Sequence, residues 1–418
     1  MKRTASSIVV CSLCLGLFFG AQSAHAAAGS VDATFGNNGI TTTNVPNTNG
    51  IVNSILLQSD GKILVFVGDS TVLRYTSSGL LDADFGADGI QALATSVDGS
   101  LGLQPNGQIV IGGVVTPSTG GAELGVERLN PSGSGDSSFG SNGLAVVSLG
   151  TRSPNVGNAA LIYPTNDPNG GDILVCTTLI SAGRRLPYQT ALARFTPSGS
   201  LDTTFGNQGL SIQTGVNGCT AMALLATGDI LVVNSEAVAQ FTSSGGVRSA
   251  VTGGTIVATS QSSSTLEAST FDASGDYLLG GEMFVGEESR GHNSSAQVQR
   301  FTQTGTEADD ATFHYSGAGG SGIEALVQGL AAQANGNIVA VGSQITFAQS
   351  GMTSVNGVAR LQMQNGSLVL DPTFGNGGTI VNNLPASSAV VIQPDGNIVT
   401  VALGGNNSDL TLVRYLGQ

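Results

Sequence analysis

The sequence has few charged and few aromatic side chains, and these shortages exclude several classes of protein. The 418 residues include no Trp, three His, and 14 Lys and Arg against 28 Asp and Glu, which gives a net charge of −14. A nucleic-acid-binding domain carries a basic surface, so this balance excludes that class. Disorder driven by charge is also excluded, because 10% of the residues are charged and 40% are hydrophobic. The 61 glycines have no period of three, which excludes collagen, and their number disfavours a helical bundle.

The first 26 residues have the three-part pattern of a secretory signal peptide. A positive start at Lys2, a short apolar run over 8–20 and a small-x-small motif over 24–26 precede Ala27. The apolar run is shorter than the roughly 20 residues that a membrane helix needs, and no later stretch is long and apolar enough. We therefore expect cleavage near Ala26, secretion to the periplasm or outside the cell, and no membrane insertion.

Cleavage at this position would change both the charge and the cysteine content. Loss of Lys2 and Arg3 takes the net charge from −14 to −16, and two cysteines remain, Cys176 and Cys219. In an oxidising compartment these two can form one disulfide. Two separate buried thiols are the alternative, and the sequence does not decide between them.

The rest of the chain is a repeat, and its first element is a hairpin signal. Five segments have a polar turn ending in Gly between two β-rich apolar runs, and they begin at Leu57, Leu103, Leu225, Gln333 and Ile392. Looser copies end at Cys176 and begin at Asp272, which makes seven. An Asp-Gly or Asn-Gly turn between such runs is typical of a β-hairpin.

Two further elements follow each hairpin in a fixed order. Arg followed by an aromatic residue or Leu occurs at Arg74, Arg128, Arg194, Arg300, Arg360 and Arg414, with a degenerate copy at Gln240. The pattern Asp-x-x-Phe-Gly-x-x-Gly then begins at Asp32, Asp82, Asp136, Asp202 and Asp371. We interpret Asp310 and Phe313 as a damaged copy of this pattern, and around Gly246 it is lost.

The repeats predict an all-β fold, a seven-bladed β-propeller. Without the signal peptide the chain has 418 − 26 = 392 residues, or about 56 for each of seven units with about four strands each. A β-solenoid is the alternative, but its rungs are usually shorter. The last unit lacks its fourth strand, and residues 40–44 supply a spare one. We therefore expect one domain over 27–418, whose N-terminal strand completes the last blade and closes the ring.

These residues and motifs resemble the delta-60 repeat family of bacterial β-propellers. The resemblance rests on the Arg-Tyr, Asp-x-x-Phe-Gly-x-x-Gly and Leu-Gln-Pro-Asp-Gly elements, and it covers nearly the whole chain after Ala26. It implies a secreted propeller-like repeat domain. It implies no reaction, and fold alone does not give function.

The repeated charged and aromatic residues are expected to be structural. A spacing of eight separates Arg74 from Asp82, Arg128 from Asp136 and Arg194 from Asp202, so we expect an Arg–Asp pair in each blade, with Arg414 and Asp32 paired across the closure. In the degenerate unit Gln240 and Arg248 hold these positions, so acid and base are expected to be lost together. The repeated Phe is interpreted as a packing plug between blades, at residues 35, 85, 139, 205, 313 and 374.

The connections between the units predict where a partner binds. Hairpins and Phe-Gly connections lie on one regular face, and the opposite, irregular face holds the variable connections over 116–123, 181–189, 282–295 and 346–356. The most polar of these holds Glu282, Glu287, Glu288, Arg290 and His292, which makes it the candidate partner loop. A solvated loop without function is the alternative.

We therefore expect a monomeric binding scaffold whose partner is an unknown protein or a cell-surface component. We expect no cofactor and no dedicated metal site, although the acidic surface could hold Ca²⁺ loosely. The competing interpretation is a propeller hydrolase or lyase with acidic residues at the central channel. The inner strands near 51–57, 218–225 and 388–393 are apolar or rich in Ser and Thr, which weighs against it.

Overall fold

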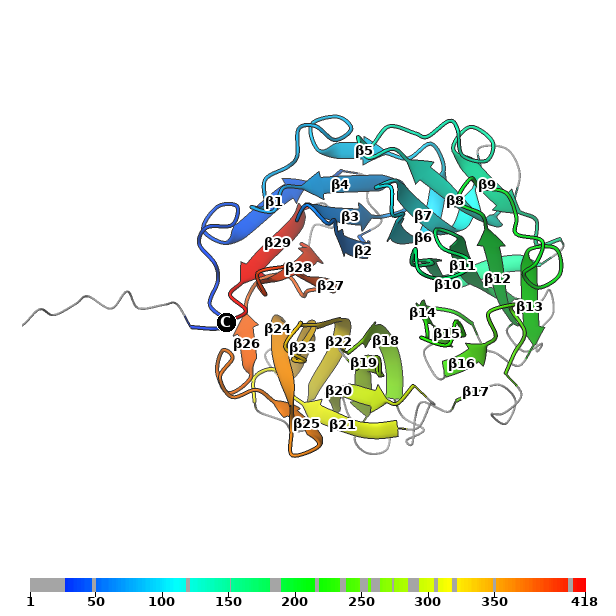
Figure 1. Ribbon diagram of the computed structural model, residues 1–418. Coiled ribbons are helices and arrows are strands. Elements are labelled where there is room, and N and C mark those ends of the chain that lie inside the picture. The colour runs from blue at the N-terminus through cyan, green and yellow to red at the C-terminus, as the bar shows by residue number, and fades with distance from the viewer. Residues whose placement is uncertain are drawn as a thin grey trace, which may run out of the picture.

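The computed structural model is a ring of seven antiparallel sheets around a central axis (Figure 1). It describes residues 27–46, 50–117, 121–150, 152–180, 189–214, 218–233, 238–248, 255–256, 264–272, 274–284, 293–303, 307–317, 322–348, 351–404 and 409–418. No helix in these residues is long and apolar enough to cross a membrane. The predicted signal peptide lies outside the described residues.

The first four blades follow one another along the chain. Blade 1 contains β2 (Val52–Leu57), β3 (Ile63–Val67), β4 (Thr71–Tyr75) and β5 (Ile90–Ala92). Blade 2 contains β6 (Ser96–Leu103), β7 (Ile109–Thr116), β8 (Glu123–Leu129) and β9 (Leu144–Val147). Blade 3 contains β10 (Ser153–Ile162), β11 (Ile173–Ile180), β12 (Gln189–Phe195) and β13 (Leu210–Thr214). Blade 4 contains β14 (Ala221–Leu224), β15 (Ile230–Val233), β16 (Val238–Phe241) and β17 (Thr255–Ile256).

Blade 5 keeps this plan, and blades 6 and 7 depart from it in their outer strands. Blade 5 contains β18 (Ser264–Phe271), β19 (Tyr277–Phe284), β20 (Ser294–Phe301) and β21 (Glu307–Phe313). Blade 6 contains β22 (Ile323–Ala332), β23 (Ile338–Ala348) and β24 (Gly351–Gln364), and both β25 (Ser367–Leu370) and β26 (Thr379–Asn382) pair with β24. Blade 7 contains β27 (Ala389–Ile392), β28 (Ile398–Leu403), β29 (Asp409–Tyr415) and β1 (Ile40–Asn44).

The closure of the ring by the N-terminal strand is confirmed. β1 pairs antiparallel with β29 from Ile40 opposite Val413 to Asn44 opposite Asp409, and Figure 1 shows these two strands side by side. The Tyr75 hydroxyl donates to the Thr43 hydroxyl at 2.8 Å, which ties the closing strand to blade 1 as well. The edge that blade 7 would otherwise expose is therefore covered by the first strand of the chain.

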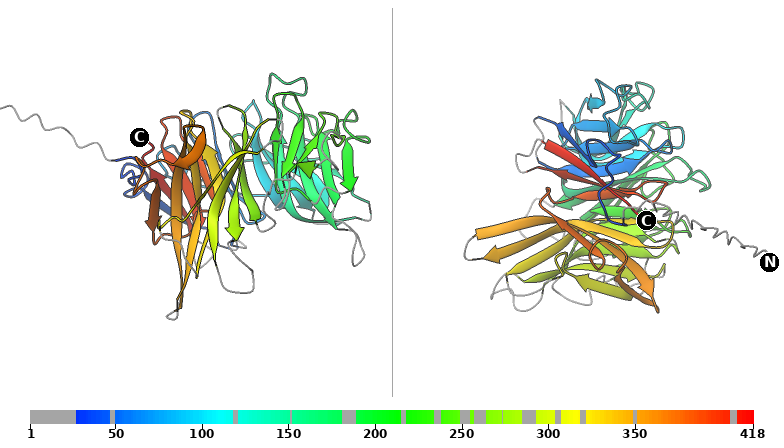
Figure 2. Two further views of the ribbon diagram at one scale, coloured as in Figure 1. Left: turned by 90° about the horizontal axis from the view of Figure 1, so that it is seen from below. Right: turned by 90° about the vertical axis from the view of Figure 1, so that its left-hand side faces the viewer.

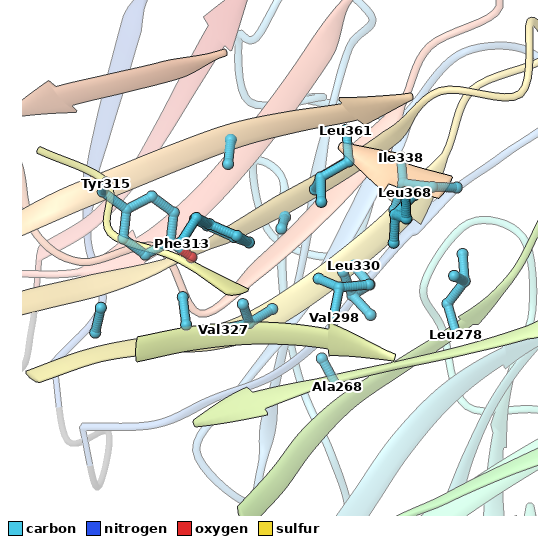
Figure 3. Close-up of a cluster of buried hydrophobic side chains, with 14 residues drawn as sticks. Ala268, Leu278, Val298, Phe313, Tyr315, Val327, Leu330, Ile338, Leu361 and Leu368 are labelled. Atoms are coloured by element: carbon cyan, nitrogen blue, oxygen red, sulfur yellow. The ribbon is translucent and has the colours of Figure 1, made fainter. Parts of the chain in front are cut away.

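An apolar layer lies between each pair of neighbouring blades, because both faces of every sheet are covered. Figure 3 shows the layer between blades 5 and 6, where Val298 and Phe313 of blade 5 meet Val327, Leu361 and other buried residues of blade 6. The innermost strands β2, β6, β10, β14, β18, β22 and β27 surround the axis (Figure 1). The hairpins after these strands turn at glycines in the left-handed region, such as Gly61 (φ 84°) and Gly107 (φ 85°).

Two local expectations were wrong. Asp310 and Phe313 do not form a damaged Phe-Gly turn, because both lie in β21, which pairs with β20. Phe313 still packs between blades 5 and 6, at the edge of the Tyr315 ring (centroids 5.3 Å apart). Residues 346–348 and 351–356 were expected in a loop, but they extend the ladder of β23 and β24. Figure 2 shows this hairpin projecting beyond the other blades.

Candidate functional site

The regular face is held by the predicted ion pairs. The structure brings together Arg74 with Asp82, Arg128 with Asp136, Arg194 with Asp202 and Arg414 with Asp32, at N–O distances of 2.7, 2.7, 2.5 and 2.8 Å. Burial by itself would raise the pKa of these carboxyl groups. Hydrogen bonds and the guanidinium charge outweigh burial and hold the pKa of each Asp below its usual value.

Each of these arginines also joins its blade to the next one. Arg128 stacks over the Phe139 ring, with 4.3 Å from the guanidinium carbon to the ring centroid, and it donates to the Pro197 carbonyl of blade 3. The Phe139 ring lies against Gly199, where a Cβ atom would come within 2.9 Å of the ring. The same Arg–Phe stacking occurs at Phe35, Phe85, Phe205 and Phe374. The regular face is therefore used for blade-to-blade packing.

Blade 4 corrects one expectation about these pairs. Arg248 stands where other blades carry Asp, and it was expected to have lost its partner together with Gln240. Instead its guanidinium binds Asp229 at 2.7 and 3.0 Å, and the Gln240 amide donates to the same carboxylate at 2.8 Å. Asp229 directly follows the hairpin glycine. Blade 4 therefore keeps an ion pair, with the acid on the hairpin and the base at the position where other blades carry Asp.

The position after the hairpin glycine also varies in other blades. Lys62 binds Asp82 at 2.9 Å in blade 1, and Asp276 binds Arg300 at 2.6 Å in blade 5. Asp172 in blade 3 lies 3.7 Å from Arg194, whose closer partner is Asp202. Burial raises the pKa of Asp172 to about 6, the Arg194 charge opposes this shift, and the nearby acids add to it. Asp172 is thus a buried acid whose counter-ion is held more closely by Asp202.

The central channel is lined by neutral groups among the residues that the structure describes. The described lining of its cavity (≈330 Å³) comes from every blade and includes Asn53, Ser100, Thr220, Gln328 and Ser388, and no charged residue is among the lining side chains that the structure describes. The backbone N–H of Leu101 donates to the Ser54 hydroxyl of the preceding blade at 2.9 Å, and the N–H of Ala160 donates to the Ser100 hydroxyl in the same way at 2.8 Å. The channel therefore offers hydroxyl and amide groups rather than a carboxylate pair.

On the irregular face, Glu282 has two acidic neighbours that the sequence did not indicate. Glu267 lies on the inner strand β18, Glu324 on the inner strand β22, and Glu282 near the end of β19. The pKa of Glu282 is raised by burial and by the Glu324 charge, and the Ser294 hydroxyl donates to its carboxylate. The pKa of Glu267 is raised by burial and by the Glu282 charge. We call Glu267, Glu282 and Glu324 the acidic group.

The structure describes part of the candidate partner loop. Glu282 belongs to β19, whereas Glu287, Glu288, Arg290 and His292 lie outside the described residues. His314, close in space, meets the Ser294 carbonyl at 3.1 Å through Nε2. Among the residues that the structure describes, no three His, Cys, Asp or Glu side chains are placed to hold a metal ion.

A disulfide joins two blades beneath this face. Cys176 of β11 is bonded to Cys219, which precedes the first strand of blade 4, with a Cα–Cα distance of 6.1 Å. Both cysteines are fully buried in the layer between blades 3 and 4. Of the two alternatives that the sequence left open, the structure contains the bridge.

A family model for a β-propeller domain of unknown function (DUF5122) matches residues 58–85, 104–139 and 182–205. These segments contain hairpins, Arg strands and Phe-Gly turns of blades 1 to 3. The chain is a β-propeller repeat protein. No curated protein matches it in sequence.

Solved structures with propeller-like similarity include three that span most of this chain. BBS1N in complex with ARL6DN is 8% identical and covers 93% of this chain and 97% of its own, with a TM-score of 0.48. Regucalcin, a calcium-binding protein from Agrobacterium tumefaciens, is 12% identical over 94% and 96%, with a TM-score of 0.38. The PQQ-bound aldose sugar dehydrogenase from Streptomyces coelicolor is 12% identical over 77% and 96%, with a TM-score of 0.37. Likenesses this remote carry no information on activity.

Proposed function

We propose that this protein is a secreted delta-60 repeat propeller that binds a partner through its irregular face. The partner is a protein or another component of the cell surface. The observation that carries the proposal is the contrast between the two faces. The regular face uses the same Arg, Asp and Phe side chains from blade to blade for packing. Among the residues that the structure describes, only blades 5 and 6 combine an acidic group with a projecting hairpin on the other face.

The proposed location has support from the chain itself. The Cys176–Cys219 bridge is the kind of bond that persists in oxidising compartments. The pattern of residues 1–26 is that of a signal peptide. Both features agree with export to the periplasm or beyond, and the recurrence of the repeat elements supports membership of the delta-60 family.

The acidic group has the properties of a recognition surface. The Glu282 charge raises the pKa of Glu267, and the Glu324 charge raises the pKa of Glu282, so a cationic partner group would relieve repulsion within the acidic group. None of the groups that shift the pKa of Glu267 or Glu282 is basic. A partner that brings Lys or Arg side chains to this face would therefore gain affinity from electrostatic complementarity.

The test compares two pairs of neutralising substitutions that remove equal charge from opposite faces. Glu282→Gln with Glu324→Gln changes the irregular face, and Asp60→Asn with Asp395→Asn changes exposed hairpin positions on the regular face. The secreted forms would be immobilised and incubated with solubilised envelope proteins and, separately, with isolated surface polysaccharide.

We expect wild type and the regular-face variant to retain the same component, and the irregular-face variant to lose it. Equal loss in both variants would show that the contact is a general charge effect. Retention by the irregular-face variant, or no retained component with wild type, would contradict the proposal. Melting curves of all three forms check that folding is unchanged.

A second candidate is a hydrolase or lyase, and one observation favours it. Glu267 lies on an inner strand, and burial raises its pKa beside a second carboxyl group, which is the arrangement that general acid–base catalysis uses. A panel of glycoside, polysaccharide and ester substrates, assayed with wild type and Glu267→Gln, tests it. Turnover that disappears in Glu267→Gln would support catalysis, and absence of turnover across the panel would count against it.

A further inference from the structure

The projecting hairpin of blade 6 has an open strand edge. β24 contains 14 residues and β23 contains 11, whereas the corresponding strands of blade 1 contain five each. Gly351, Met352, Thr353 and Ser354 are exposed, and the Met352 side chain is 66% exposed. On the side of β24 away from β23, β25 and β26 cover residues 356–364 in part, and no described residue pairs with 351–355. We call Gly351–Val355 the open edge.

The direction of the free backbone groups follows from one hydrogen bond. The N–H of Phe347 donates to the Gly322 carbonyl at 2.7 Å, so the backbone groups of Phe347 point away from β24. Met352 lies opposite Phe347, so its own N–H and C=O point outward from the hairpin. The two-residue period of a strand gives Ser354 the same orientation. The open edge thus offers two donors and two acceptors in a row.

The existing ladder shows why this edge remains open. β26 pairs with β24 from Thr379 opposite Ala359 to Asn382 opposite Asn356, and the same antiparallel course would next reach Val355. Pro385 follows shortly after β26 and has no N–H to donate, which disfavours continuation of the strand. A strand from elsewhere can therefore extend a ladder that already has its geometry set.

The composition of the hairpin points to a second copy of this chain as that strand. Residues 343–359 contain no charged side chain, although the whole chain has a net charge of −14. By contrast β21, the outermost strand of blade 5, carries Glu307, Asp309 and Asp310, and charges of this kind disfavour edge-to-edge pairing. Five residues of strand span about 16 Å, which exceeds the Debye length of about 8 Å at physiological ionic strength. Two acidic rings can therefore meet at these tips with most of their mutual repulsion screened.

We propose that two copies of the protein associate by antiparallel pairing of their open edges about a two-fold axis at Thr353. In this register Met352 of each copy faces Ser354 of the other, so the outward backbone groups of both residues are hydrogen-bonded. Thr353 of one copy faces Thr353 of the other in a pair without backbone hydrogen bonds, with Cα atoms about 4.5 Å apart. The contact is far smaller than a standard interface, so the dimer is weak and reversible. The proposal differs from the expectation of a monomer.

Single cysteines test both the association and its register. Thr353→Cys places two thiols at a separation that a disulfide can span, whereas Ser354→Cys places them diagonally, about 7–8 Å apart or more. Gln213→Cys, on the outer strand β13, is the control for random collision. Each variant of the secreted protein would be oxidised over a range of concentrations and the covalent dimer measured on a non-reducing gel. Melting curves check that each variant is folded.

We expect covalent dimer from Thr353→Cys at concentrations where Ser354→Cys and Gln213→Cys remain at the collisional background. Adding Met352→Lys to Thr353→Cys should return the yield to background, because two like charges then lie beside the pair. Background yield from Thr353→Cys would overturn the proposal. Equal yields from Thr353→Cys and Ser354→Cys would also overturn it, because the tips would then meet without this register.

Discussion

The ion pair across the ring closure allows a quantitative test of how the propeller is held together. Asp32 and Arg414 are separated by nearly the whole chain, and their side chains meet at 2.8 Å. Both residues are over 90% buried. Asp32→Asn keeps the turn hydrogen bond to Thr34 through the remaining oxygen but removes the countercharge of Arg414. Removing one partner of a buried pair typically costs about 3–5 kcal/mol, because the other charge stays buried.

Arg414 keeps other contacts in Asp32→Asn, so the expected loss of stability lies near the lower end of this range. Its guanidinium still donates to the Ser77 carbonyl and the Gln393 amide oxygen, at 3.0 and 3.1 Å. We therefore expect Asp32→Asn to lower the free energy of unfolding by about 3 kcal/mol, measured by urea denaturation at pH 7. The matched control is Asp60→Asn, whose exposed carboxylate lies 3.9 Å from Lys62 and whose loss should cost at most about 1 kcal/mol.

A double variant separates the pair from its surroundings. Asp32→Asn combined with Arg414→Leu removes both charges, so its loss should be smaller than the sum of the two single losses by about 1 kcal/mol or more. If Asp32→Asn costs no more than Asp60→Asn, the closure does not depend on this pair. Strict additivity of the double variant would also refute the reasoning.

Three further predictions follow from burial, covalent linkage and strand pairing. Burial raises the pKa of Asp172 to about 6, above its unfolded value near 4, so the wild type loses stability as the pH rises from 4 to 6. Asp172→Asn should not show this loss. Its stability relative to wild type should therefore rise by on the order of 3 kcal/mol between pH 4 and pH 7, measured by melting at the two pH values. A difference that does not change with pH would contradict the raised pKa. Cys176→Ser with Cys219→Ser removes a bridge with a sequence separation of 43, which should lower the free energy of unfolding by about 4 kcal/mol in denaturant titrations. An unchanged free energy of unfolding would show that the bridge does not constrain the unfolded chain. Deletion of 27–44 removes the closing strand and should lower the melting temperature of the whole domain, and a melt like that of the full chain would contradict the closed ring.

The repeat spacing predicted the fold because every blade solves the same packing problem with the same residues. The position of Ile40–Asn44 before the first hairpin and the absence of a fourth strand after Arg414 were enough to predict the closure. The exchange at Arg248 was missed because its acid lies on the hairpin, at a position that carries Lys62 in blade 1 and Asp229 in blade 4. The sequence did contain a signal: the unit that lacks the Asp of the Asp-x-x-Phe-Gly pattern has an Asp directly after its hairpin glycine.

The features of blades 5 and 6 could not be obtained from repetition, because they occur once. Chain length between hairpin and Arg strand indicated a long connection at 346–356, but a strand extension and a loop have the same length in sequence. Alternation of Ile345 and Phe347 with polar residues was the local sign of a strand. The acidic group depends on three strands meeting in space, so Glu267 and Glu324 had no signal within their own segments.

The most direct test of the central claim is amide hydrogen exchange of the protein with and without the envelope component that it retains. In the bound state we expect slower exchange at the irregular-face ends of β19 and β22 and along the β23–β24 hairpin. The hairpins at 58–62 and 104–108 of the regular face should not change. Slower exchange confined to the regular-face hairpins, or to the lining of the central channel, would contradict it.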